Sequence, residues 1–266
     1  GPGFLGMKYA NFNIGNPGSP PENVSPPSGI SSERMTRRAE LFKEVEGSLK
    51  TKVPMDASQA HKDVYKKALD LVVSSRKDVF TFNAKDTKDL ERYGNSGFGR
   101  GCLMARKLVE AGAACVEVSL GGWDMHNGIA GALDRTLPVL DGGMGSLVED
   151  LAQSGRLKDT VVVWMGDFGR TPKINQNAGR DHFPRAWSVV VGGGNIKGGV
   201  AYGATNKDGT DVTDNKVTIK DLYSTLYYGL GIDPTPESNA SVRDNLGRPY
   251  HIADTDKPMK IKELVG

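Results

Sequence analysis

Two short stretches of the sequence place Asp and His side chains close to one another. Asp124 and His126 stand two residues apart after Gly121-Gly122, and Asp181 and His182 are adjacent in a later stretch. In an extended loop, residues i and i+2 point to the same side, so Asp124 and His126 could reach one ion. Carboxylate oxygens and imidazole nitrogens together suit Zn²⁺, Mn²⁺ or an iron ion. These stretches therefore predict a divalent metal site, with zinc as the first choice.

A further carboxylate, Asp167, comes directly after an apolar run from Val161 to Met165. A run rich in β-branched residues is typical of a strand that is buried on both faces. Open α/β sheets bind their ligands at the carboxyl ends of such strands, which brings Asp167 into the predicted site. The predicted metal ligands are Asp124, His126, Asp167, Asp181 and His182.

Two arginines flank the same region of the chain. The planar guanidinium groups of Arg170 and Arg180 could bind phosphate or sulfate oxygens bidentately and offset charge that develops in a reaction. The alternative is structural, because Asp167 and Asp181 could cap turns or pair with these arginines. The residues alone leave both alternatives open.

The elements that would position these residues are those of an α/β protein. Strands are expected at 115–120, 160–165 and 187–191, and a long helix at 129–154 connects the first two. Such a connection between parallel strands is a right-handed crossover. The predicted fold is α/β, with a central, mostly parallel sheet flanked by helices.

Helical spacing and capping signals also mark the remaining helices. Pro138 and the pair Gly142-Gly143 should bend or break the long helix. Gly112 should end a helix at its C′ position, and Thr218 with Asp221 has the spacing of a capping box. The other helices are expected at 35–49, 55–74, 86–93, 102–111 and 218–230.

Composition excludes some classes of protein without selecting one. The chain has 266 residues, a net charge of +2 and 38% hydrophobic residues, which is enough for a sizeable core. Basic residues do not cluster with aromatic ones, so we expect no nucleic-acid binding. No apolar run approaches the ~18 residues that a membrane span needs. Cys102 and Cys115 are expected to be small buried apolar residues.

Composition along the chain also predicts its domain organisation. Residues 1–30 are rich in Gly, Pro, Asn and Ser, with interspersed aromatic residues, which indicates an extended segment that packs on a surface. Residues 31–266 are expected to form a single α/β domain. Within it, 31–112 should be mainly helical and 113–266 should carry the sheet.

The motifs at the predicted site resemble those of the bacterial DUF1501 family. The likeness rests on Gly-Gly-Trp-Asp-x-His, Gly-Asp-Phe-Gly-Arg-Thr-Pro-Lys-Ile-Asn and Gly-Arg-Asp-His-Phe-Pro, and it extends over nearly the whole chain. That family is similar to the alkaline phosphatase/sulfatase superfamily, whose fold is a mostly parallel sheet between helices, with metals at the strand ends. The resemblance implies a metal-dependent hydrolase of phosphate or sulfate esters, including small-molecule esters and sulfated or phosphorylated glycans.

Carried over to this sequence, the resemblance implies that Asp124 and His126 bind one metal ion. It makes His182 a later histidine ligand and Asp181 a ligand or the residue that orients it. Phe168 stands where the superfamily has a histidine after the strand-end aspartate. This departure favours the alternative function, a non-catalytic relative that serves in binding, structure or assembly.

A segment that the resemblance leads us to expect is missing from this sequence. Nothing here is similar to the family's Gly-Pro-Ser-x-x-Asp-Thr-Phe-Asp-like segment, which should supply another metal ligand and a nucleophilic hydroxyl. We therefore expect the chain to be a C-terminal portion that depends on the missing segment or on another chain. The export signals of relatives lead us to expect a periplasmic or exported protein.

Overall fold

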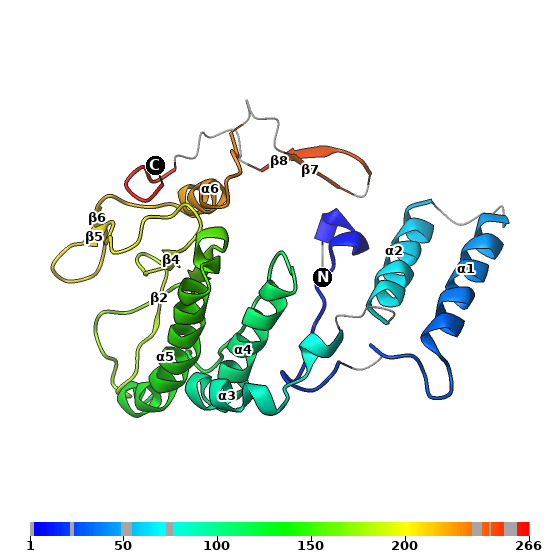
Figure 1. The fold of residues 1–266 in the computed structure, drawn as a ribbon. Coiled ribbons are helices and arrows are strands. Elements are labelled where there is room, and N and C mark those ends of the chain that lie inside the picture. The colour runs from blue at the N-terminus through cyan, green and yellow to red at the C-terminus, as the bar shows by residue number, and fades with distance from the viewer. Residues whose placement is uncertain are drawn as a thin grey trace. The chain divides into compact units, whose positions relative to one another are not determined.

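The computed structural model describes residues 3–21, 24–48, 55–72, 77–235, 241–244, 246–252 and 260–265. Over these ranges the protein is mostly helical, with small two-stranded sheets (Figure 1). The helices are α1 (Ser32–Ser48), α2 (Met55–Val72), α3 (Thr87–Tyr93), α4 (Gly97–Glu110), α5 (Ile129–Gln153) and α6 (Ile219–Gly229). Short 3-10 turns are η1 (Gly3–Leu5), η2 (Met7–Tyr9), η3 (Lys77–Phe80), η4 (Ala84–Asp86) and η5 (Arg156–Asp159).

The chain divides into two compact units. One comprises Gly1–Leu90, Lys107–Val116 and Val242–Tyr250, and the other comprises Glu91–Arg106, Glu117–Ser241 and His251–Gly266. Every residue of the predicted metal site lies in the second unit. The domain boundaries expected near residues 30 and 112 remain predictions.

The strands form pairs. Three of these pairs are antiparallel: β1 (Val162–Trp164) with β4 (Val190–Gly192), β2 (Gly169–Arg170) with β3 (His182–Phe183), and β5 (Ala204–Thr205) with β6 (Val212–Asp214). The last pair is β7 (Ser241–Arg243) with β8 (Pro249–His251). The β2–β3 pair matters most for the site, because it places Arg170 opposite His182.

The predicted central parallel sheet is wrong for the part of the chain that the structure describes. The strand expected at 160–165 shortens to β1, which pairs antiparallel with β4, and 115–120 forms no strand. Val163 is 37% exposed and Met165 is 44% exposed, so the run is not buried on both faces. The run is apolar enough for burial, but a central strand also needs hydrogen-bonded neighbours on both edges, and β1 has only β4 among the described residues.

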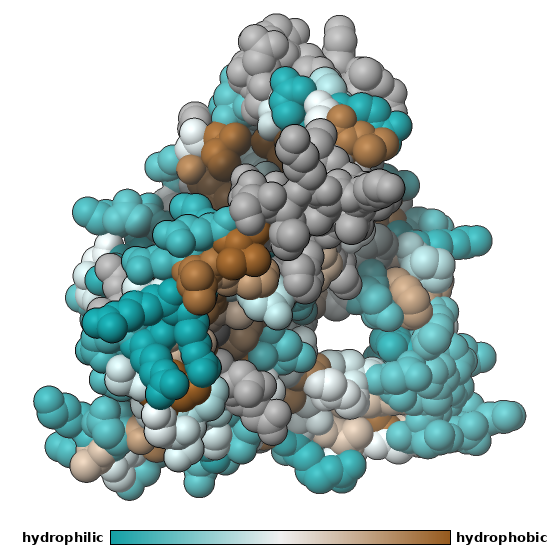
Figure 2. Space-filling view, turned by 90° about the vertical axis from the view of Figure 1, so that its right-hand side faces the viewer, coloured by the Kyte–Doolittle hydropathy of each residue, from teal (hydrophilic) through white to brown (hydrophobic). Residues whose placement is uncertain are grey.

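Apolar side chains also remain at the surface, where Figure 2 shows brown hydrophobic residues among teal hydrophilic ones. Cys102 is buried as expected, whereas Cys115 is exposed, so its predicted burial is wrong. Among the residues that the structure describes, the segment that contains Cys115 pairs with no strand. Within the described ranges, no helix combines the length and the apolar character needed to cross a membrane.

The helices agree better with the sequence. Thr218 and Asp221 form the expected capping box at the start of α6. Gly112 has a positive φ, and Ala113 N donates to Leu108 O, which closes the C-terminus of α4 as expected. α5 is continuous from Ile129 to Gln153, so the chain is not broken there, and the alternative of a bend stays a prediction.

The glycines of α5 serve packing. A Cβ atom on Gly143 would lie 2.9 Å from the Phe98 ring and 3.3 Å from Gly99 Cα of α4. The glycine therefore lets α4 and α5 approach closely, and the surrounding packing holds the helix together. Pro138 lies inside this helix without ending it.

A buried ion-pair network also joins α3, α4 and α5. Tyr93 Oη donates to Asp150 Oδ2 at 2.7 Å, Arg92 Nη2 donates to Asp150 Oδ1 at 2.5 Å, and Arg106 also donates to this carboxylate. Burial alone would raise the pKa of Asp150, but the hydrogen bonds from Tyr93, Arg92 and Arg106 outweigh it and lower the pKa. Asp150 is therefore an ionised carboxylate inside the helical layer.

A second core lies around the C-terminal segment. Ile196, Ile261, Leu264 and Val265 are buried together, and partly buried residues such as Leu226 of α6 pack against them. Thr225 Oγ1 accepts a hydrogen bond from Ile261 N at 3.0 Å. This core fixes α6 and the loop after β4 within the unit that carries the site.

Candidate metal centre

Three of the predicted ligands lie together at the surface of the second unit. Asp124 and His126 come from the loop before α5, and His182 begins β3. Asp124 Oδ1 lies 2.9 Å from His182 Nε2 and 3.2 Å from His126 Nδ1. One ligand atom from each of the three residues lies within 4.8 Å of the others. We call Asp124, His126 and His182 the triad.

The triad fits a divalent cation. An ion bound tetrahedrally at about 2.0–2.1 Å from nitrogen and oxygen ligands keeps neighbouring ligand atoms about 3.3 Å apart. The observed distances of 2.9 and 3.2 Å are close to this value. Two imidazoles and one carboxylate are a zinc ligand set that leaves a position open for water or substrate. The ligand chemistry and the two distances from Asp124 therefore suit a zinc-like ion.

One side chain holds the two ligand-bearing loops together. Asn175 Nδ2 donates to His126 O at 3.1 Å and to Asp181 Oδ1 at 2.9 Å. Its Oδ1 accepts from Asn177 N at 3.0 Å and from Gly179 N at 2.9 Å. Asn175 therefore both shapes its own turn and connects that turn to the loop that carries Asp124 and His126.

Backbone hydrogen bonds continue this connection. Arg180 N donates to Met125 O at 3.0 Å, and Ile129 N donates to Ala178 O at 2.8 Å. The second bond satisfies an N–H group in the first turn of α5, which has no side-chain cap. A Cβ on Gly179 would lie 2.0 Å from His126 C, so only glycine allows this approach.

Arg170 packs beside the triad. Its Nη1 donates to Asp124 Oδ1 at 2.5 Å, and its guanidinium lies 5.6 Å from the centre of the Phe168 ring. The Phe168 ring is in turn 4.6 Å from the His182 ring. Hydrogen bonds from His182 and then Arg170 lower the pKa of Asp124, so this carboxylate is ionised.

The other predicted site residues take different positions. Asp167 Oδ1 accepts from Phe168 N at 2.8 Å, as in a turn. Asp181 accepts from Asn175 and precedes the predicted ligand His182; its role as a ligand or as the residue that orients one stays a prediction. Arg180 Nη1 donates to Thr171 O and, at 2.7 Å, to Pro172 O, and thereby closes its loop. The structure therefore gathers Asp124, His126, His182 and Arg170, whereas Asp167, Asp181 and Arg180 make other contacts.

Asn175 is a residue of this site that the sequence does not single out, because its type and its neighbours are typical of a turn. Its side chain accepts from backbone groups two and four residues later, which is turn chemistry. The bond to His126 O joins residues far apart in the sequence. The turn spacing Asn-x-Asn-x-Gly was the available signal, and it carried no information about this second contact.

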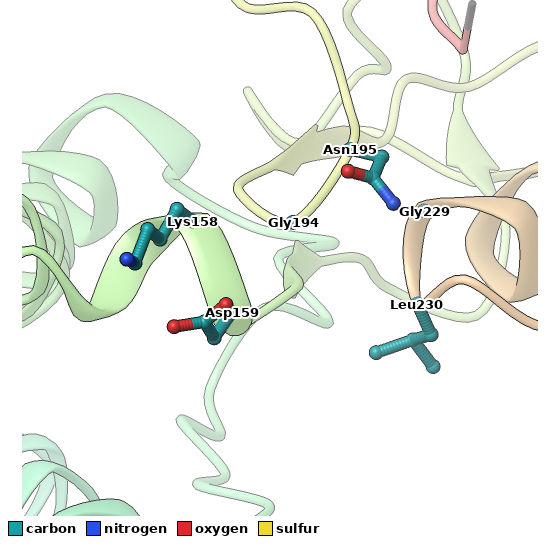
Figure 3. A pocket seen from close by; sticks show the side chains of 6 residues that line it. All are labelled: Lys158, Asp159, Gly194, Asn195, Gly229 and Leu230. Carbon is teal, nitrogen blue, oxygen red and sulfur yellow. The ribbon is translucent and has the colours of Figure 1, made fainter.

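A pocket of about 230 Å³ lies elsewhere in the same unit (Figure 3). Its lining comes from η5, the loop after β4 and the end of α6, and consists of Lys158, Asp159, Gly194, Asn195, Gly229 and Leu230. None of these residues belongs to the triad or contacts Arg170 among the described residues. The pocket lacks a cluster of metal-binding side chains, so we place the chemistry at the triad.

The geometry thus defines a protein that carries a surface centre of one carboxylate and two imidazoles on two joined loops. The chain belongs to the family described as "Protein of unknown function (DUF1501)", whose profile matches residues 1–265. The resemblance noted from the motifs is therefore confirmed. No curated protein and no solved structure matched the chain.

Proposed function

We propose that the protein binds a divalent metal ion, zinc in the first instance, at Asp124, His126 and His182, and that, when complete, it hydrolyses phosphate or sulfate esters there. The observation that carries the proposal is the convergence of the three ligand atoms within 4.8 Å. When bound, the ion would act as a Lewis acid toward an ester oxygen. The proposed substrates are small-molecule esters or sulfated or phosphorylated glycans.

Arg170 supports the choice of an anionic substrate. Its side chain is only 21% exposed and lies against Phe168, so the guanidinium is held in place. A fixed guanidinium beside a metal site can bind a phosphate or sulfate oxygen and stabilise charge that develops there. Arg180 would act indirectly, because its guanidinium holds the loop that leads to His182.

One observation favours a second candidate, metal-dependent binding without catalysis. The side chains of Asp124 and His182 are 65% and 52% exposed. Electrostatic catalysis is strongest where water is excluded, and these exposures leave the triad open to solvent. A binding module would keep the metal and the anion contact without turnover.

The test begins with metal content. Purified full chain is loaded with Zn²⁺, freed of excess metal and analysed for bound zinc, and is then assayed with a panel of aryl phosphates and aryl sulfates. Asp124→Ala and His182→Ala should lose the bound zinc and the turnover together. Asp208→Ala, which removes an exposed carboxylate outside the triad, is the matched control and should retain both.

The outcomes separate the candidates. Zinc that depends on the triad together with triad-dependent turnover supports the hydrolase. Zinc that depends on the triad, without turnover of any ester, supports the binding module. Wild-type protein that holds no zinc, or variants that retain it fully, would refute the metal centre.

A further inference from the structure

The Asp124 carboxylate already has a cation beside it. Its Oδ1 lies 2.5 Å from Arg170 Nη1, 2.9 Å from His182 Nε2 and 3.2 Å from His126 Nδ1. A carboxylate oxygen has about two lone-pair sites, yet three nitrogen atoms converge on this one. Two of them are the imidazole nitrogens that would have to turn their lone pairs toward a metal ion. Arg170 therefore supplies the positive charge at the point where the ion would bind.

Arg170 also has hydrogen-bonding capacity left over. A guanidinium has five N–H donors in a planar fork, and Nη1 of Arg170 donates to Asp124. Among the described residues, no other acceptor for this fork is found, although the side chain is only 21% exposed. The stacking against Phe168 keeps the group near the triad even when the bond to Asp124 breaks.

We propose that the Arg170 guanidinium competes with the metal ion for the Asp124 carboxylate. Once the ion has bound, the guanidinium releases this carboxylate and binds the anionic ligand. This inference rests on the proposed metal site and adds an order of binding to it. The metal ion binds first, and a tetrahedral oxyanion, phosphate or its monoester, binds second. Arg170 exchanges the Asp124 carboxylate for an oxygen of that anion.

The charges of the site explain why the metal ion binds before the anion. A divalent ion and a guanidinium that share one carboxylate repel each other, and a single negative charge cannot offset both. Binding of the ion therefore weakens the pair between Arg170 and Asp124. The ion and the released guanidinium together attract an oxyanion, to which Arg can bind bidentately. By linkage, the anion must then tighten metal binding by the same factor.

The first arm of the test measures metal affinity. Zn²⁺ is titrated calorimetrically into metal-free full chain, wild type and variants. Arg170→Met keeps an unbranched side chain but removes the competing charge, so it should bind Zn²⁺ about tenfold more tightly. Arg170→Lys retains the charge and should resemble wild type. Arg185→Met removes a surface arginine, 3.9 Å from Asp211, and is the matched control that should leave Zn²⁺ affinity unchanged.

The second arm measures the anion. Inorganic phosphate and phenyl phosphate are each titrated into wild type and Arg170→Met, with and without Zn²⁺. We expect wild type to bind only when Zn²⁺ is present, and Arg170→Met to bind at least about tenfold more weakly under the same conditions. Tighter binding of phenyl phosphate indicates an ester as the ligand, and tighter binding of inorganic phosphate indicates the free ion; either fits the proposed order.

Two results would overturn the inference while leaving the metal site intact. One is Zn²⁺ affinity in Arg170→Met that is equal to or weaker than that of Arg185→Met. The other is equal phosphate affinity of wild type with and without Zn²⁺. A wild-type chain that binds no Zn²⁺ at all would instead refute the metal site itself and the inference with it. Thermal melting of each metal-free variant identifies any affinity change that is due to misfolding.

Discussion

At the scale of single residues, Asn175 does more for the site than its place in a polar turn indicates. Its amide connects the turn at 175–179 to the backbone of His126 and also orients Asp181, the neighbour of His182. An exposed turn can adopt many geometries, so this one amide restricts where the two ligand loops meet. Ligands that are held in position before the ion arrives bind it more tightly.

Replacement of Asn175 by Ala should therefore weaken the metal site. The variant loses the side-chain contacts to His126 O and Asp181 and the turn bonds from Asn177 N and Gly179 N. We expect Zn²⁺ affinity to fall 10–100-fold, roughly the range for removing groups that support metal ligands. Calorimetric titration measures this change.

A measurement without metal keeps this prediction independent of the proposed function. In the metal-free variant, the amides of Arg180 and Ile129, which donate across the two loops, should exchange faster with solvent. Asn177→Ala is the matched control, because the backbone of Asn177 makes its contacts and would be retained. Equal exchange and equal affinity in the two variants would show that Asn175 does not hold the loops.

At the scale of elements, the carboxylate of Asp150 connects α5 to α3 and α4. It lies on α5, is 9% exposed and receives hydrogen bonds from Tyr93 of α3 and Arg106 of α4. A buried charge of this kind is held by its partners, and removal of one member leaves the others uncompensated. The network therefore fixes the packing of α3, α4 and α5 and gives their stability a pH dependence.

The pKa of Asp150 is lower in the folded protein than the ordinary value of about 3.9 in an unfolded chain. The folded state therefore binds fewer protons, so the stabilisation is complete above about pH 4 and is lost as the pH falls through the folded pKa. Asp150→Asn should lower the free energy of unfolding at pH 7 by about 3–5 kcal/mol. It should also flatten the acid limb of the stability profile.

Urea denaturation between neutral and acid pH measures both effects. Asp141→Asn is the matched control, because Asp141 is an exposed carboxylate on the same helix, so its stability profile should follow wild type. An Asp150→Asn variant with the wild-type acid limb would contradict the assignment of this pH dependence to Asp150.

The helices and the strands differ in how far the sequence could predict them. Thr218 with Asp221, and Gly112 after α4, are local signals, and the structure uses them as expected. The run Val161–Met165 is different, because a strand is defined by partners elsewhere in the chain. The sequence correctly predicted that this run forms a strand. The length of the strand, its burial and the direction of its pairing were predicted wrongly.

At the scale of the whole molecule, the sheet is the main correction. The expected parallel sheet needed strands at 115–120 and 160–165 side by side, and the described residues contain only short two-stranded sheets. The chain belongs to the DUF1501 family along residues 1–265, but this membership does not by itself show a parallel sheet. The function that we propose therefore rests on the triad and does not depend on a fold shared with phosphatases or sulfatases.

The sequence predicted the site residues that depend on local spacing better than those that depend on how strands pair. Asp124 and His126 were found from their spacing, and the motif around His182 completed the triad that the structure forms. Asp167 was included because a strand end in a parallel sheet would have placed it there, and that sheet is absent from the described residues. Arg170 reaches Asp124 because β2 pairs with β3, which no pattern in the sequence specified.

The most direct test of the central claim is an anomalous-diffraction structure of the full chain loaded with Zn²⁺. We expect one zinc ion bound by a carboxylate oxygen of Asp124 and by nitrogens of His126 and His182, with bonds of about 2.0–2.1 Å. A zinc ion bound by other residues, such as Asp167, with the triad nitrogens turned away, would contradict the account. So would a chain in which no ordered zinc ion is found at the triad at saturating Zn²⁺.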